Sequence, residues 1–224
     1  MNVLVIAPHR DDEILGVGGT ILKRKAAGDR VTVCVATASE GMEWTEHTKT
    51  IHREMLQAHA YCGIDRYIGL PFKPVILESY SRSDFNKALL QVVREEAPEE
   101  VYVPFWGDMQ KDHRLVCEAA MVVLRAKYKH PVQRIYAYET LSETGINLPN
   151  AENAFLPNVF EDISDYLEQK LHALHFFASQ MSDFPDLRSY QAVEALARLR
   201  GATADLPAAE AFMLIREIKR VGER

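Results

Sequence analysis

The chain has 224 residues, 47% of them apolar and 26% charged, which is typical of a globular protein with a hydrophobic core. Its formal net charge of −6 argues against a general attraction to nucleic acid or to an anionic membrane surface. We therefore expect neither of them to be its partner.

Short apolar runs alternate with longer amphipathic segments through the first part of the chain. In chain order, the pattern predicts a strand at 2–7, a helix at 13–27, a strand at 31–37, a helix at 52–61, a short strand at 66–70, a helix at 84–96, a strand at 100–104, a helix at 114–128 and a strand at 132–138. Apolar runs without polar alternation are typical of strands covered on both faces. The order predicts an α/β fold: a doubly wound, mostly parallel sheet with helices on both faces.

The last third of the sequence has a different character. Segment 139–157 reads as a loop, 163–177 and 190–199 read as helices, and a short segment at 208–218 closes the chain. No repeat, linker or low-complexity stretch separates this part from the rest. We expect residues 1–224 to form a single domain.

The compartment is inferred from what the sequence lacks. The first apolar run passes directly into charged residues, so it does not resemble a signal peptide. No window approaches the roughly 18 apolar residues of a membrane span. Three widely spaced cysteines, Cys34, Cys62 and Cys117, suggest free thiols in a reducing compartment. A cytoplasmic protein is the default expectation.

The first polar cluster follows the first predicted strand, where segment 8–13 reads PHRDDE. Ionisable groups at a buried strand end are costly unless they are solvated or serve a ligand. In doubly wound folds, ligands bind beyond the carboxyl ends of the strands. His9 and Asp12 are three residues apart, so one tight turn can direct both at one point. Imidazole with carboxylate suits zinc or a similar divalent ion.

The second polar cluster, 107–113 (GDMQKDH), follows the fourth predicted strand as the first cluster follows the first strand. His113 and Asp108 should therefore lie at the same edge of the sheet. A catalytic zinc takes three protein ligands and keeps one position open for water. His9, Asp12 and His113 supply that number. The sequence predicts a Zn²⁺ site, with Fe²⁺ or Co²⁺ as alternative ions.

Each cluster also has a purely structural interpretation. The carboxylates of Asp11, Asp12 or Glu13 could cap the following helix or complement its dipole, and Asp112 could cap the helix after it. The joint placement of both clusters at the ends of parallel strands favours the metal site.

Both clusters resemble motifs of one enzyme family. The string APHRDDEILGVGGT at 7–20 resembles the signature of the LmbE-like, or PIG-L, N-deacetylases, usually PHPDDE followed by a glycine-rich helix start. GDMQKDHR at 107–114 resembles that family's second motif, usually HxDH. Further similarities occur in order along almost the whole chain, at Arg53-Glu54, Tyr138-Glu139, Ser179-Gln180 and Arg200-Gly201.

The resemblance implies a Rossmann-like fold and zinc-dependent removal of an acetyl group from an N-acetylated sugar or sugar conjugate. It places the family's metal ligands on His9, Asp12 and His113, and its general base on Asp11, which would take a proton from water as the water attacks the amide carbonyl. Asp112 would orient an active-site imidazole from behind.

Two residues depart from the family pattern. Arg10 replaces the usual proline, and we interpret it as a solvent-facing side chain rather than a cation at the mouth of the site. Gln110 replaces the first histidine of HxDH, which is thought to stabilise the oxyanion or donate a proton. A glutamine amide can donate a hydrogen bond to substrate but cannot act as an acid. The general acid is therefore left open, with return of the proton by Asp11 itself as one alternative.

The resemblance and the strand ends suggest further contacts to substrate. Arg53 resembles a family arginine that binds substrate hydroxyls, although an exposed helix arginine is an equal alternative. Asp108 would contact substrate or support an active-site side chain. Glu139, at the end of the fifth predicted strand, would bind substrate or pair with Arg10.

We therefore expect a metal-dependent amidohydrolase acting on a small N-acetyl sugar or glycoconjugate. A hydrolase of another amide or ester and a catalytically weakened sugar-binding relative are the alternatives. The sugar acceptor, the native metal and the oligomeric state are left open, a homo-oligomer being one alternative.

Overall fold

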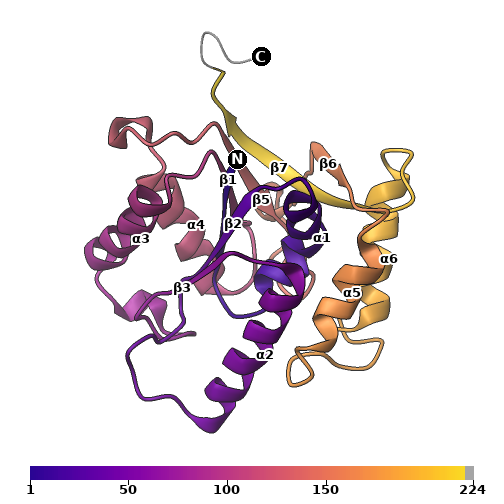
Figure 1. Ribbon diagram of the computed structural model, residues 1–224, viewed down its shortest axis with the longest axis horizontal. Helices are drawn as coiled ribbons and strands as arrows, with labels where there is room; N and C mark the ends of the chain where they lie inside the picture. The colour runs from indigo at the N-terminus through magenta and orange to yellow at the C-terminus, as the bar shows by residue number, and fades with distance from the viewer. Residues whose placement is uncertain (220–224) are drawn as a thin grey trace.

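The computed structural model describes residues 1–219. A seven-stranded sheet runs through its centre in the order β3-β2-β1-β4-β5-β7-β6 (Figure 1). The strands are β1 (Asn2–Ala7), β2 (Arg30–Val35), β3 (Arg66–Gly69), β4 (Glu100–Pro104), β5 (Arg134–Tyr138), β6 (Val159–Asp162) and β7 (Ala209–Glu217). The helices are α1 (Asp12–Ala26), α2 (Glu46–Cys62), α3 (Arg82–Glu96), α4 (Lys111–Val123), α5 (Leu167–His175) and α6 (Tyr190–Ala202).

The first five strands are parallel, whereas β7 pairs antiparallel with both β5 and β6. This arrangement confirms the predicted α/β fold with a mostly parallel sheet. The sequence did not predict β6, and it assigned no type to the segment that forms β7. Both strands depend on pairing between distant segments, because Val159 lies opposite Phe212.

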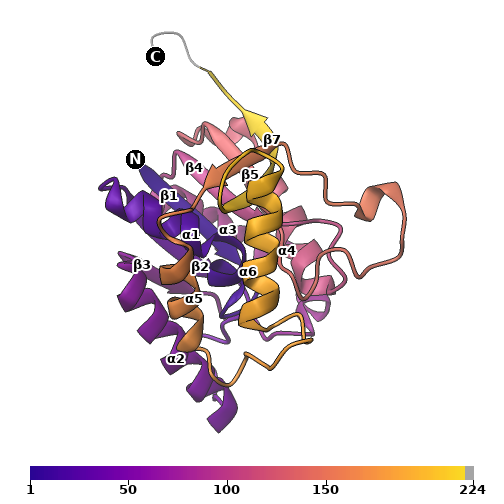
Figure 2. The same cartoon turned by 90° about the vertical axis from the view of Figure 1, so that its right-hand side faces the viewer.

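Helices cover both faces of the sheet, and the strand β1 shows why its sequence is continuously apolar. Val3, Val5 and Ala7 belong to the core beneath α1, α2, α5 and α6, while Leu4 and Ile6 belong to the core beneath α3 and α4. Successive strand residues point to opposite faces, so a strand buried on both faces has no polar position. Figure 2 shows α1, α5 and α6 on the face turned toward the viewer.

Two helices begin at least three residues earlier than predicted, and both shifts concern the site. The helix α2 begins at Glu46, where the Thr45 side chain caps it by accepting a hydrogen bond from the Thr48 N–H. The helix α4 begins at Lys111 and ends at Val123, so the second polar cluster enters the first helical turn. Within residues 1–219, no helix is both long and apolar enough to cross a membrane.

Candidate active site

Two neighbouring strand ends bring the polar clusters together. The strands β1 and β4 are adjacent and parallel, with Val3 opposite Glu100. The chain leaves β1 at Ala7 and enters α1 at Asp12, so the first cluster spans that turn. The segment after β4 leads to Lys111 at the start of α4. Because the strands run in the same direction, both turns lie at one edge of the sheet, as the sequence predicted.

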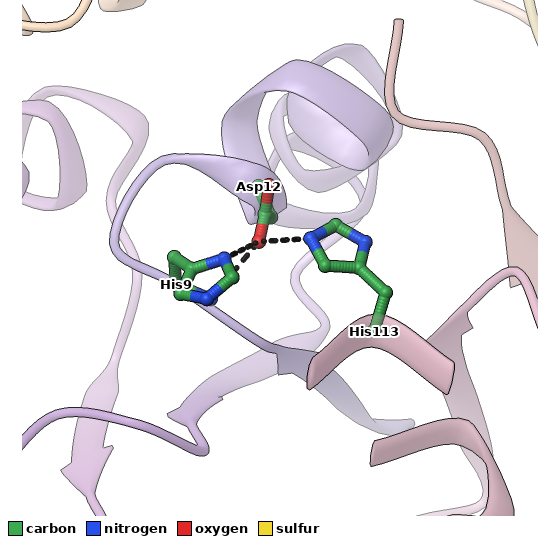
Figure 3. A group of neighbouring side chains, drawn as sticks. All are labelled: His9, Asp12 and His113. Carbon is green, nitrogen blue, oxygen red and sulfur yellow. Dashed lines mark hydrogen bonds and ion pairs between the residues drawn. The ribbon is translucent and has the colours of Figure 1, made fainter. Parts of the chain in front are cut away.

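His9, Asp12 and His113 converge on one carboxylate oxygen (Figure 3). The His9 Nδ1 atom and the His113 Nε2 atom each lie 3.2 Å from Asp12 Oδ2. Ligand atoms of the three residues all lie within 4.8 Å of one another. Two imidazole nitrogens and a carboxylate oxygen form the donor set that divalent zinc prefers.

Unsatisfied polar atoms show that this cluster fits a metal ion. The side chains of Asp12 and His113 are almost completely buried. Within the described part of the chain, Asp12 Oδ1 makes no hydrogen bond, and His113 Nε2 has only its ion-pair contact with Asp12 Oδ2. Buried polar atoms in folded proteins are nearly always hydrogen-bonded, so these two atoms suit a cation as a shared partner. The site is therefore consistent with a divalent metal.

Two further carboxylates hold the outward-facing nitrogens of the histidines. Asp112 Oδ2 lies 3.1 Å from His9 Nε2, and it also accepts the Val75 N–H at 2.6 Å. Asp108 Oδ2 lies 2.9 Å from His113 Nδ1. Such partners fix the orientation of a metal-binding imidazole and raise its basicity. Of the two roles considered for Asp108, its full burial and this contact fit support of an active-site side chain.

The electrostatics of the cluster favour positive charge at its centre. Burial alone would lower the pKa of His9, but hydrogen bonds to Asp112 and Asp12 outweigh it and raise that pKa to about 9. The same balance, with Asp12 and Asp108 as partners, raises the pKa of His113 to about 10. The two imidazoles hold the pKa of Asp12 well below its usual range. The carboxylates therefore stabilise cations at this point, whether protons or a metal ion.

The acidic residues of the first cluster do not act as helix caps. Asp11 occupies the N-cap position of α1, but its side chain makes no capping hydrogen bond. The Asp12 carboxylate instead accepts the His9 N–H at 2.9 Å, outside the helix. Glu13 is buried and lies 2.7 Å from His59 Nε2. The capping interpretation of segment 8–13 is therefore not supported, whereas Asp12 and Glu13 lie in the first turn of α1, where their charges complement the helix dipole.

Asp11 is buried beside the cluster of His9, Asp12 and His113, and its ion-pair partner comes from the later part of the chain. An Nη atom of Arg188, in the loop before α6, forms an ion pair with Asp11 Oδ2. Burial raises the pKa of Asp11, Arg188 opposes that rise, and the neighbouring carboxylates Asp12 and Glu13 add to it, giving about 6. A carboxyl group tuned upward in this way suits proton transfer near neutral pH.

Sequence reasoning missed Arg188, and no motif around it marked the residue. It lies 177 positions from Asp11 in the chain. Only the packing of α5 and α6 against the sheet brings its loop to the site.

A cavity of ≈ 320 Å³ opens onto this group of residues. His9, Asp11, Gln110, Glu143, Gln180 and Arg188 are among the residues that line it. The volume is at the lower end of the range for small-molecule sites, which is roughly 300–1,000 Å³. The cavity wall therefore combines one residue of the His9, Asp12 and His113 cluster with the Asp11 carboxylate and several hydrogen-bonding side chains.

A family assignment follows from comparison with known proteins. Residues 4–124, more than half of the chain, match the profile of the PIG-L family, described as GlcNAc-PI de-N-acetylase. The chain belongs to this family. The match confirms the resemblance seen in the two motifs and assigns the protein to a family of metal-dependent N-deacetylases.

Individual relatives of this PIG-L protein are distant. It is 29% identical over 196 residues to diacetylchitobiose deacetylase of Thermococcus kodakarensis, covering 83% of this chain and 71% of that protein. It is 25% identical over 193 residues to a probable N-acetyl-alpha-D-glucosaminyl L-malate deacetylase 2 of Bacillus anthracis, covering 81% and 82%. A solved structure of a conserved protein from Thermus thermophilus matches with a TM-score of 0.77 at 25% identity, covering 100% of this chain and 99% of that one.

The structure places three further residues of this PIG-L chain, and it contradicts the interpretation of Arg10 as solvent-facing. Arg10 is not solvent-facing: its guanidinium donates to the Ala38 carbonyl and lies 4.9 Å above the Trp44 ring, leaving the residue 7% exposed. Arg10 also lines the cavity beside His9 and Asp11, which agrees with the alternative interpretation of a cation near the site.

Glu139 neither pairs with Arg10 nor points freely toward a substrate. Its two carboxylate oxygens accept hydrogen bonds of 2.8 and 2.7 Å from Arg200, on α6. Arg53 is exposed on α2 and is not among the residues that line the cavity.

Gln110 lies on the cavity wall, immediately before the first residue of α4. Its Oε1 atom is buried and makes no hydrogen bond within residues 1–219. This oxygen is therefore available to accept a hydrogen bond from a ligand, although the amide cannot supply a proton.

Proposed function

We propose that this protein is a zinc-dependent N-deacetylase that removes the acetyl group from an N-acetylated sugar or sugar conjugate. In this proposal His9, Asp12 and His113 hold the zinc ion, and Asp11 is the general base. The observation that carries the proposal is the cluster of His9, Asp12 and His113, which lies beside a cavity whose wall includes His9 and Asp11. The membership in the PIG-L family and the two deacetylase relatives support the same reaction.

The chemistry divides between the metal and the protein. A bound zinc ion supplies Lewis acidity, which polarises a carbonyl group and lowers the pKa of water. The chain's own contribution is proton transfer and positioning. Asp11 lies on the cavity wall next to Asp12, with its carboxylate oriented by Arg188. The Asp11 carboxylate takes the proton that water loses when the water oxygen attacks the acetyl carbon.

The lining of the cavity suits a sugar. Thr37, Ser39, Gln110 and Gln180 supply hydroxyl and amide groups that pair with sugar hydroxyls. Gln110 is the member of this set next to the second motif, so we assign it to binding of the acetamido group or its neighbouring hydroxyl. Specific roles for Arg53 and Glu139 in binding require movement, because one is exposed on α2 and the other is paired with Arg200.

Other properties remain predictions. We expect one domain over residues 1–224, of which the last five lie outside the described residues. A cytoplasmic location is supported by three free cysteines. The ion could equally be Fe²⁺ or Co²⁺ on donor type alone.

Acetate release from a panel of N-acetylated sugars tests the proposal. The panel includes N-acetylglucosamine, diacetylchitobiose and N-acetylglucosamine carrying an anionic aglycone. We expect about one zinc per chain by elemental analysis, and loss of both zinc and acetate release in His113→Ala. The matched control is His175→Ala on α5, whose Nδ1 atom contacts only the Leu171 carbonyl among the hydrogen bonds of the described chain. Fully metallated protein that releases no acetate from any sugar refutes the proposal.

A further inference from the structure

The departing amine of an amide needs a proton, and the residue at the family's histidine position cannot give one. Gln110 occupies that position, and an amide does not act as an acid. Four titratable side chains line the cavity within residues 1–219 apart from the arginines: His9, Asp11, His47 and Glu143. His9 is assigned to the metal and Asp11 to the base. The remaining acids are His47, which is exposed on α2, and Glu143.

The backbone fixes Glu143 beside Gln110. The Glu143 carbonyl accepts the N–H of Met109, the residue before Gln110, at 3.1 Å. The Glu143 N–H donates to the Thr140 carbonyl at 2.8 Å, which closes the turn after β5. The strand ends that carry these segments are paired, with Pro104 opposite Tyr138. Glu143 therefore lies next to the place from which the family histidine would act.

Residues next to Glu143 connect the same turn to the cluster of His9, Asp12 and His113 by hydrogen bonds. Thr144 Oγ1 donates to Asp108 Oδ1 at 2.5 Å, and the other oxygen of Asp108 holds His113. The Asn147 side chain donates to the Gly107 and Asp108 carbonyls at 3.2 Å. These contacts leave the turn little freedom, so the Glu143 side chain projects from a fixed position.

The carboxyl group of Glu143 has no structural partner. It is half-buried on the cavity wall, and no hydrogen bond or ion pair engages it within the described chain. Burial raises its pKa above the ordinary value, the charges of His113 and Arg188 oppose that rise, and Asp12 and Asp108 add to it. Such a group keeps a larger protonated fraction near neutral pH than a surface glutamate does.

We propose that Glu143 is the general acid of this enzyme and takes over the proton-donating role that Gln110 cannot perform. The inference rests on the proposed deacetylase function. As the water oxygen bonds to the acetyl carbon, Asp11 takes one water proton. The carbon–nitrogen bond then breaks with its electron pair on nitrogen, and that nitrogen receives the proton of Glu143. The products are the amine and acetic acid; solvent takes the proton from Asp11 and returns one to Glu143.

The test compares leaving groups. Wild-type protein, Glu143→Gln and the control Glu168→Gln, an exposed residue of α5, are assayed on the best N-acetyl sugar of the panel and on p-nitrophenyl acetate. Loss of a general acid costs about 10²–10⁴-fold in kcat on the amide. The ester is much less affected, since p-nitrophenolate leaves without a proton. The control matches wild-type protein on both substrates.

A binding measurement provides a readout that does not depend on turnover. Once Glu143 has donated its proton, its carboxylate faces the product amine. Solvent then protonates that amine, so the two groups carry opposite charges. We expect Glu143→Gln to weaken glucosamine binding by about tenfold to a hundredfold, as for loss of a charged hydrogen bond, and to leave glucose binding unchanged. Calorimetry on both zinc-free and zinc-loaded protein measures the difference, and thermal melting together with Glu143→Ala controls for folding.

The outcomes separate the two proposals. Wild-type protein without acetate release from any sugar refutes the deacetylase function, and the acid assignment falls with it. Normal wild-type turnover with an unimpaired Glu143→Gln variant refutes the acid assignment alone. Equal losses on amide and ester would show a structural role and overturn it too. A selective loss in His47→Gln instead of Glu143→Gln assigns the acid to His47.

Discussion

The two halves of the site are built differently. Everything that would hold the metal comes from two short segments of the first 124 residues: the ligands His9, Asp12 and His113, and the carboxylates Asp108 and Asp112 behind them. Proton transfer, in contrast, would depend on the later part of the chain, which supplies Arg188 as the partner of Asp11 and Glu143 as the proposed acid. The family profile covers residues 4–124 and so includes the whole metal-holding part, whose last residue is His113.

The difference suggests that metal binding and proton transfer can be altered separately. Each ligand is held by a carboxylate or backbone group near it in the chain or, for His9, also by Asp112 in the first turn of α4. Asp11, in contrast, stands between the two regions: its backbone belongs to the first motif, and its partner Arg188 lies in the loop before α6. Substitutions in one region should therefore leave the property of the other intact.

The largest effect is expected for Asp11→Asn. An amide at this position cannot accept the proton of water, so we expect kcat to fall by about 10²–10⁴-fold. Zinc content, measured by elemental analysis, should equal that of wild-type protein because Asp11 is not a ligand. Loss of zinc in this variant would contradict the separation of the two regions.

Zinc affinity should depend steeply on pH. The pKa values of about 9 for His9 and about 10 for His113 mean that both imidazoles are protonated at pH 7, whereas ligation requires them neutral. Lowering the pH through the range below 9 therefore weakens zinc binding by up to about a hundredfold per pH unit, the slope for two released protons. Calorimetry in buffers of different ionisation enthalpy counts these protons; a count of zero would refute the charge assignment.

A smaller effect is expected for Asp108→Asn. This change removes the charge that orients His113 while keeping its shape, so zinc affinity should fall by about 10–100-fold. Competition with a chelator measures the loss. If Asp108 acted only on substrate, KM would rise and zinc affinity would stay constant, which is the opposite pattern.

The smallest effect concerns stability in the later region. Glu139→Gln removes the charge from a partly buried pair with Arg200, which should lower the free energy of unfolding by about 1–2 kcal/mol. The control is Glu194→Gln, which removes an exposed pair with Arg198 and should cost less than about 0.5 kcal/mol. Urea unfolding of zinc-loaded protein compares the free energies of unfolding of the two variants. Equal losses would contradict a stabilising role for the contact between Glu139 and Arg200.

Local patterns carried most of the fold prediction. The continuous apolar run of β1 and the periodic runs of α1 and α3 gave element types that the structure confirms, within a few residues at each end. Tertiary pairing decided the rest. The strand β7 pairs with β5 and β6, and neither the four residues of β6 nor the sequence of β7 contains a signal strong enough to predict a strand alone.

By itself, the sequence determined the family and the three residues that converge at the metal site, because His9 and Asp12 share one turn and His113 follows the adjacent parallel strand. Only the tertiary structure decided which side chains complete that site. It buried Arg10, paired Glu139 with Arg200, and brought Arg188 to Asp11 from 177 residues away. Chain spacing fixes the geometry of neighbours within a turn, whereas contacts between distant segments depend on how whole helices pack against the sheet.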